Sequence, residues 1–138
     1  MNAKKRLVIL DTHAILHRAY HALPDFSSSK GEPTGALYGL ISMLVKIITD
    51  LRPDYIVAAF DLPGPTYRHI AYKEYKSTRL KADDDLISQI KRSRDVLDAF
   101  GIPRFECPTF EADDVIGTIV EKVTKNPLAG GLEVIIAS

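Results

Sequence analysis

Short continuous apolar runs alternate along this chain with longer segments in which apolar residues recur every three or four positions. The short runs predict buried strands at 7–10, 55–60, 102–107 and 132–137. The periodic segments predict helices over 14–22, 35–51, 83–100 and 113–124. Thr34 and the acids Asp83, Asp84 and Asp85 are the expected N-terminal caps of the second and third helices. The alternation predicts an α/β fold with a mostly parallel sheet sandwiched by helices.

The composition narrows the class of protein. With 138 residues, 46% of them hydrophobic, the chain is long enough for one domain with a real core. The net charge is zero, so any affinity for nucleic acid must come from a local cluster of charge. The single Cys107 allows no internal disulfide, and its apolar neighbours predict a buried, inert thiol. Leu7–Leu10 is too short for a signal peptide or a membrane span, so we expect a cytoplasmic protein with no membrane association.

Acidic residues follow the predicted strands. Asp11 and Asp61 each end a buried run, and Glu111, Asp113 and Asp114 stand where the last helix begins. Acids at a helix start commonly complement the helix dipole. However, the carboxyl ends of parallel strands meet at one edge of the sheet, so we expect all five acids to face one cleft. An all-oxygen site of this kind favours Mg²⁺ or Mn²⁺, and a pair of such ions about 4 Å apart can hydrolyse a phosphodiester.

A basic segment begins a few residues after Asp61. Residues 66–81 contain five lysines and arginines against one glutamate, interleaved with tyrosines. Tyr72, Lys76 and Arg79 have i, i+4, i+7 spacing, so a helix here would present one cationic and aromatic face. A solvated helix face is the alternative interpretation, but interleaved aromatic rings favour binding to single-stranded nucleic acid.

Three histidines, His13, His17 and His21, recur at i, i+4 and i+8 in the first predicted helix. A zinc site would need further ligands converging from elsewhere in the chain. We therefore expect these imidazoles to be partly exposed or bonded locally.

An ordered set of motifs extends over nearly the whole chain. The motifs are Leu10-Asp11, Arg18-Ala19-Tyr20-His21-Ala22, Gly31-Glu32-Pro33-Thr34-Gly35-Ala36-Leu37-Tyr38-Gly39, Phe60-Asp61, Tyr67-Arg68, Tyr75-Lys76 with Arg79, and Glu111-Ala112-Asp113-Asp114-Val115-Ile116-Gly117. This set resembles the 5′-nuclease domain of bacterial DNA polymerase I. The resemblance implies a PIN/FEN-like fold, hydrolysis of DNA 5′ ends and flaps, a monomer, and two Mg²⁺ or Mn²⁺ ions in the complete domain. It also implies a helical arch at 66–82 over the active site.

The same resemblance assigns roles to individual residues. The expected metal ligands are Asp11, Asp61, Glu111, Asp113 and Asp114. Lys76 and Arg79 join them as expected catalytic residues, and Tyr75 is expected to stack on a base. The expected DNA-binding residues are Arg18, Tyr67, Arg68, Tyr72, Lys73, Tyr75, Lys76 and Arg79.

Two departures from the family pattern matter. Thr12-His13 follows Asp11 where the family usually has Gly and a small residue, so His13 could alter strand entry. The Gly-Asp-x-Asp segment and the helix-hairpin-helix region that follow the family's last matching strand are absent after 134–138. We therefore expect residues 1–138 to be an incomplete N-terminal piece of a longer nuclease or polymerase.

Other function classes fit the sequence less well. A non-catalytic nucleic-acid-binding fragment that lacks the second-metal acids is the main alternative. A haloacid-dehalogenase-like phosphatase would need Asp-x-Asp where Asp11-Thr12-His13 stands. A dinucleotide-binding domain would need a Gly-x-Gly-x-x-Gly motif after Leu10.

Overall fold

The computed structural model describes residues 4–77, 83–126 and 131–138. The strands are β1 (Arg6–Asp11), β2 (Tyr55–Ala59), β3 (Arg104–Phe105) and β4 (Glu133–Ala137). The helices are α1 (Thr12–Ala22), α2 (Gly35–Leu51), α3 (Tyr67–Ala71), α4 (Asp84–Ala99) and α5 (Ala112–Lys125). The predicted strands and long helices are all present, and α3 is an additional short helix.

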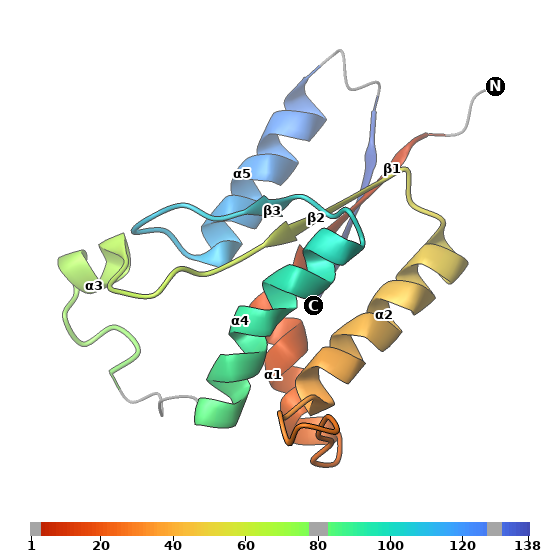
Figure 1. Ribbon diagram of the computed structural model, residues 1–138. Helices are drawn as coiled ribbons and strands as arrows, with labels where there is room; N and C mark the ends of the chain where they lie inside the picture. The colour runs from red at the N-terminus through yellow and green to blue at the C-terminus, as the bar shows by residue number, and fades with distance from the viewer. Residues whose placement is uncertain (1–3, 78–82, 127–130) are drawn as a thin grey trace.

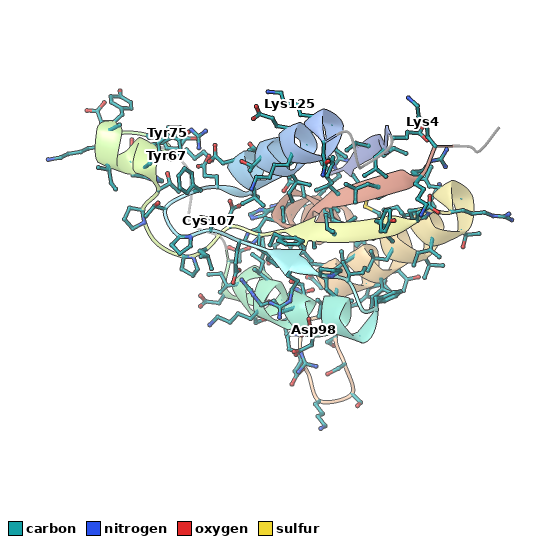
Figure 2. The ribbon with its side chains drawn as sticks, turned by 90° about the horizontal axis from the view of Figure 1, so that it is seen from above. Lys4, Tyr67, Tyr75, Asp98, Cys107 and Lys125 are labelled. Carbon is teal, nitrogen blue, oxygen red and sulfur yellow. The ribbon has the colours of Figure 1, made fainter. Side chains whose placement is uncertain are left out.

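The four strands form one parallel sheet in the order β3-β2-β1-β4, with helices on both faces (Figure 1). Viewed from above, α5 lies on one side of the strands, and α2 and α4 lie on the other (Figure 2). Side chains of β1 alternate between two cores, as a strand buried on both faces requires. Val8 and Leu10 pack with α1, α2 and α4, whereas Leu7 and Ile9 pack with α5. The predicted α/β fold class is therefore confirmed.

Helices α1 and α2 cross closely at Gly39. A Cβ atom built on Gly39 would lie 2.4 Å from the Cβ of Ala19, so only glycine fits without a shift of one helix. This close crossing fixes α1 against α2, and α1 begins directly at the end of β1. The first turn of α1 is therefore held rigidly at the carboxyl edge of the sheet.

The start of α2 is capped differently from the prediction. Thr34 is the N-cap residue, but its side chain makes no capping hydrogen bond. Instead, Gln89 reaches across from α4, and its Oε1 accepts hydrogen bonds from the backbone N–H groups of Ala36 (2.7 Å) and Leu37 (3.2 Å). The start of α2 is buried against α4, so a side chain from a neighbouring helix satisfies the free N–H groups that every helix start leaves.

Three further local predictions were wrong. Cys107 is exposed, because it lies in the loop after β3 rather than in a long strand. That strand is confined to Arg104–Phe105 at the sheet edge, between two prolines that interrupt pairing. Within the described part of the basic segment, residues 66–77, the only helix is α3, which ends at Ala71, and Tyr72 has an extended backbone. Thus no helix joins Tyr72 to Lys76, and Arg79 lies outside the described residues.

The described residues contain no helix long and apolar enough to cross a membrane.

Candidate functional site

A cleft of about 320 Å³ opens at the carboxyl edge of the sheet. Its lining comes from the end of β1, the first turns of α1, the second residue after β2, the start of α5 and the basic segment. The lining residues are Asp11, His13, Ala14, His17, Asp61, Lys76, Glu111, Ala112 and Asp113. Four of the five predicted acids therefore meet in one cleft, as the parallel topology requires.

Asp11 ends β1 and is also the N-cap of α1. Its Oδ1 accepts a long hydrogen bond of 3.4 Å from the N–H of Ala14. Burial raises the pKa of the Asp11 carboxyl, and the nearby carboxylates of Asp113 and Asp61 raise this pKa further, although the bond from Ala14 opposes them. The cleft therefore gathers more negative charge than it neutralises around Asp11.

Asp61 is anchored to the start of α5. Its Oδ1 accepts a 2.6 Å hydrogen bond from the N–H of Ala112, one of the free donors at that helix end. Its Oδ2 lies 3.7 Å from Nδ1 of His13. The His13 ring packs edge-on against Phe60 at 5.6 Å, and burial lowers the pKa of this histidine despite the nearby carboxylate. One oxygen of Asp61 is thus fixed by the backbone, and the other points toward His13.

Glu111 is the most heavily bonded acid in the cleft. Its Oε2 accepts hydrogen bonds from Nη1 of Arg68 (2.9 Å) and the hydroxyl of Tyr75 (3.2 Å). Its Oε1 accepts a 2.9 Å bond from Nζ of Lys76. Burial would raise the pKa of Glu111, but Lys76, Tyr75 and Arg68 outweigh that effect and lower it. The basic segment is therefore docked on this acid.

Asp114 does not line the cleft. It pairs with Arg68 through two hydrogen bonds, Nη1 to Oδ2 and Nη2 to Oδ1, each 2.8 Å long. Its Oδ2 also accepts a bond from the N–H of Glu111, which closes a capping box at the start of α5. The bonds from Arg68 hold the pKa of Asp114 at about 2, below its ordinary value of 3.8. In this structure Asp114 joins α5 to the basic segment.

The remaining predicted DNA-binding residues occupy three surroundings. Tyr67 and Tyr75 lie near one another at the α3 end of the molecule (Figure 2). Tyr72 and Lys73 are exposed on the outside of the same segment. Arg18 is elsewhere, with its Nη1 donating a 3.0 Å hydrogen bond to the carbonyl of Ser138.

His13 was expected at the site from the sequence, but His17, which also lines the cleft, was not. The spacing of the two histidines carried the signal, because residues four positions apart lie on adjacent turns of one helix face. Gln89 was also missed, although a glutamine within the apolar stripe of α4 was visible in the sequence. In both cases a polar residue in a helix becomes buried or enclosed when the chain folds.

The donor chemistry of the cleft fits a hard divalent cation. Carboxylate oxygens are the ligands that Mg²⁺ and Mn²⁺ prefer. Burial, and to a smaller extent the carboxylates of Asp113 and Asp61, raise the pKa of Asp11, and a bound cation would favour its charged form. The arrangement is not tightly convergent, however. In the part of the chain that the structure describes, no three His, Cys, Asp or Glu side chains form a group that could hold one ion. Glu111 is directed toward the basic segment instead.

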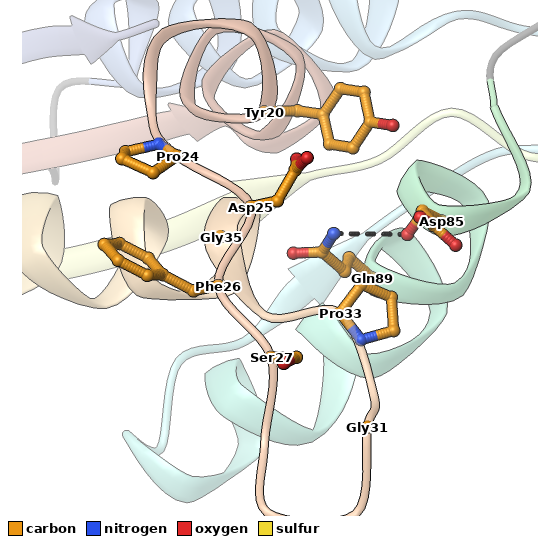
Figure 3. A pocket seen from close by; sticks show the side chains of 10 residues that line it. All are labelled: Tyr20, Pro24, Asp25, Phe26, Ser27, Gly31, Pro33, Gly35, Asp85 and Gln89. Carbon is orange, nitrogen blue, oxygen red and sulfur yellow. Dashed lines mark hydrogen bonds between the residues drawn. The ribbon is translucent and has the colours of Figure 1, made fainter.

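A second cavity of about 240 Å³ lies between the loop after α1 and the start of α4 (Figure 3). Gln89 lines it and donates a 3.2 Å bond from Nε2 to the carbonyl of Asp85. Tyr20 also lines the cavity, and its hydroxyl donates a 2.9 Å hydrogen bond to a carboxylate oxygen of Asp83. This bond joins α1 to the start of α4, and Gln89 joins α4 to α2, so the cavity lies among the elements that support the site.

The fold and the cleft place the chain among α/β domains that have an acidic site at the carboxyl edge of a parallel sheet. Residues 6–138 match the family model described as the 5′-3′ exonuclease, N-terminal resolvase-like domain. The chain therefore belongs to the 5′-3′ exonuclease family.

Sequence similarity to a 5′-3′ exonuclease and to a DNA polymerase I supports this assignment. The chain is 45% identical over 121 residues to a 5′-3′ exonuclease of Aquifex aeolicus, covering 88% of this chain and 42% of the relative. It is 40% identical over 126 residues to DNA polymerase I of Bacillus subtilis, covering 91% of this chain and 14% of the polymerase. The chain thus spans less than half of the length of these relatives.

Solved structures show the same fold. A structure of T5 5′-exonuclease with bound zinc superposes with a TM-score of 0.61 at 19% identity, covering 96% of this chain and 49% of the exonuclease. T5 D15 protein co-crystallised with metal ions gives a TM-score of 0.60, also at 19% identity, with coverage of 97% and 48%. The PIN/FEN-like fold implied by the sequence is thereby confirmed.

Proposed function

We propose that this domain is a divalent-cation-dependent 5′-3′ exonuclease and flap endonuclease, acting on DNA 5′ ends within a protein like DNA polymerase I. The observation that carries the proposal is the convergence of Asp11, Asp61, Glu111 and Asp113 in one cleft beside Lys76, in a chain of the 5′-3′ exonuclease family. The names of the relatives, a 5′-3′ exonuclease and a DNA polymerase, support the same reaction.

The four cleft acids would hold Mg²⁺ or Mn²⁺, two ions in the complete domain. When bound, such ions activate water and stabilise the charge on a phosphodiester. Asp61 is held for this role by the N–H of Ala112 at the start of α5. Asp114 would act on the same site through Arg68, with which it is paired.

The basic segment would bind the DNA strand. Lys76 lines the cleft and would bind a phosphate, and the neighbouring Tyr75 would stack on a base. Arg18, Tyr67, Arg68, Tyr72, Lys73 and Arg79 are assigned to the same strand by the sequence resemblance.

The test is Mn²⁺-dependent cleavage of a 5′-labelled flap DNA. We expect Asp61→Asn and Asp113→Asn to lower the cleavage rate by roughly a hundredfold or more, because each removes a candidate cation ligand. Their affinity for the same DNA in Ca²⁺ should stay within about threefold, since neither residue is a cationic contact. Glu121→Gln, at an exposed acid on the same helix as Asp113, is the matched control and should cleave at the wild-type rate.

The alternative of a non-catalytic DNA-binding domain has a distinct outcome. DNA binding with a steep salt dependence, but no cleavage in either Mg²⁺ or Mn²⁺, would favour that alternative. Cleavage that survives Asp61→Asn and Asp113→Asn would refute the assignment of the cleft.

A further inference from the structure

The two oxygens of Glu111 have unequal partners. Oε2 accepts hydrogen bonds from both Arg68 and Tyr75, whereas Oε1 accepts a hydrogen bond from Lys76. A carboxylate that binds a cation must direct at least one oxygen to that ion. Displacement of Lys76 would make Oε1 available while leaving the partners of Oε2 in place.

Arg68 is held independently of Glu111. Both terminal nitrogens of its guanidinium bind the two oxygens of Asp114 at 2.8 Å, a bidentate pairing that fixes the orientation of the side chain. Its carbon Cζ also lies 4.5 Å from the centroid of the Tyr67 ring. The base of the basic segment therefore keeps its attachment to α5 whatever partner Glu111 takes.

Lys76 is partly exposed. Its ammonium donates a 2.9 Å hydrogen bond to Oε1 of Glu111, and 31% of its side-chain area remains exposed. Its φ is 56°, in the left-handed region that residues other than glycine rarely adopt. Such a conformation persists only where surrounding contacts enforce it, so loss of the contact to Glu111 would favour relaxation of the backbone.

We propose that Lys76 and a divalent cation compete for Oε1 of Glu111. In the structure Lys76 pairs with Glu111 through Oε1. Cation loading would displace Lys76 toward the mouth of the cleft, where it can meet a DNA phosphate, while the Arg68–Asp114 pair keeps the segment anchored. This inference rests on the proposed function, because the competing cation is the one that the cleft acids would bind.

The experiment measures Mn²⁺ affinity without DNA, by electron paramagnetic resonance of the free ion. We compare the wild-type chain with Lys76→Met, Glu111→Gln and the double variant. Lys76→Met should bind Mn²⁺ about three- to tenfold more tightly, the range expected for release of one partly exposed ion pair. Lys73→Met removes a charge from the same segment without a contact to Glu111, and its Mn²⁺ affinity should stay within about twofold of wild type.

The double variant separates competition from simple charge repulsion. If Lys76 acts through Glu111, its replacement should change Mn²⁺ affinity little in the Glu111→Gln background. An equal gain in both backgrounds would show repulsion at a distance and overturn the inference. No gain from Lys76→Met would overturn it too.

Asp61→Asn distinguishes failure of the inference from failure of the proposed function. If the wild type binds Mn²⁺ and Asp61→Asn weakens that binding, the cleft is the cation site, and a null result at Lys76 refutes only the competition. If the wild type does not bind Mn²⁺ at millimolar concentration, and Lys76→Met does not either, both proposals fail.

Discussion

Replacement of Gln89 by leucine tests the support beneath the site. Gln89 is buried, and its side-chain oxygen is the acceptor for two N–H groups at the start of α2. Leucine has a similar volume but offers no acceptor. The substitution would therefore leave the donors of Ala36 and Leu37 without their protein partner while keeping the core filled.

The size of the effect follows from burial. Ala36 is fully buried and makes the shorter bond, so its unpaired N–H should cost about 2 kcal/mol. Leu37 is partly exposed and can gain a water molecule, so its share should be about 1 kcal/mol or less. Added apolar burial offsets a part of this total, which gives a net loss of about 2 kcal/mol. For a chain of this size that corresponds to a melting temperature lower by roughly 7 °C.

Thr34→Ala is the paired control. A threonine that capped α2 through its side chain would lose about 1 kcal/mol on replacement by alanine. Because the Thr34 side chain makes no such bond, we expect a loss below about 0.5 kcal/mol. Thermal and urea unfolding, followed by circular dichroism, give both free energies on the same scale.

The relative stabilities of the two variants show which side chain caps α2. If Thr34→Ala is as destabilising as Gln89→Leu, the cap is local and the contact from α4 is not the one that holds α2. If Gln89→Leu unfolds within about 0.5 kcal/mol of wild type, water replaces the glutamine at no cost and the reasoning from burial is refuted.

For four other substitutions the structure predicts whether the protein becomes more or less stable. Gly39→Ala should destabilise the fold by about 1–3 kcal/mol in urea unfolding, because the added Cβ would clash with α1. Gly117→Ala should stabilise the protein by about 0.5–1 kcal/mol in the same assay, because Gly117 has open space around it and alanine favours the helix. Asp11→Asn should raise the melting temperature measured in EDTA. Burial raises the pKa of Asp11, so the folded state disfavours the charged carboxylate. Asparagine removes that charge and can still cap α1. The pKa of Asp114 is depressed to about 2, so its pairing with Arg68 stabilises the fold above pH 4 and is lost as the pH falls toward 2. The stability difference between wild type and Asp114→Asn should therefore be largest near pH 5 and shrink in acid, and a difference that does not change with pH would contradict this account.

The strands and long helices could be predicted from the sequence because local periodicity specifies them. Leu7 to Leu10 is apolar without interruption, and the structure buries the alternate residues of this strand on opposite faces. The placement of Asp11 and Asp61 at one edge followed from parallel pairing alone. These inferences needed only the handedness and direction of α/β connections.

Contacts between distant residues could not be predicted in the same way. Gln89 lies 53 residues from Ala36, and Arg68 lies 43 and 46 residues from Glu111 and Asp114. No local sequence pattern indicates that a glutamine will cap another helix. Nor does one indicate that an arginine will form hydrogen bonds with two acids of a candidate metal site. Cys107 was misplaced for a related reason, because two prolines shortened the strand that was expected to bury it.

The placement of charge in the cleft indicates how stability and the proposed activity oppose each other. Glu111 and Asp114 are neutralised by cations of the basic segment, and both have a lowered pKa, so their charges stabilise the fold. Asp11 has a raised pKa, so its charge is unfavourable in the folded state without a cation. A cation bound near Asp11 would offset this unfavourable burial of charge, and Glu111 could join in binding that cation through Oε1 once Lys76 moves away. Cation binding and movement of Lys76 should therefore be linked, because each becomes more favourable when the other occurs.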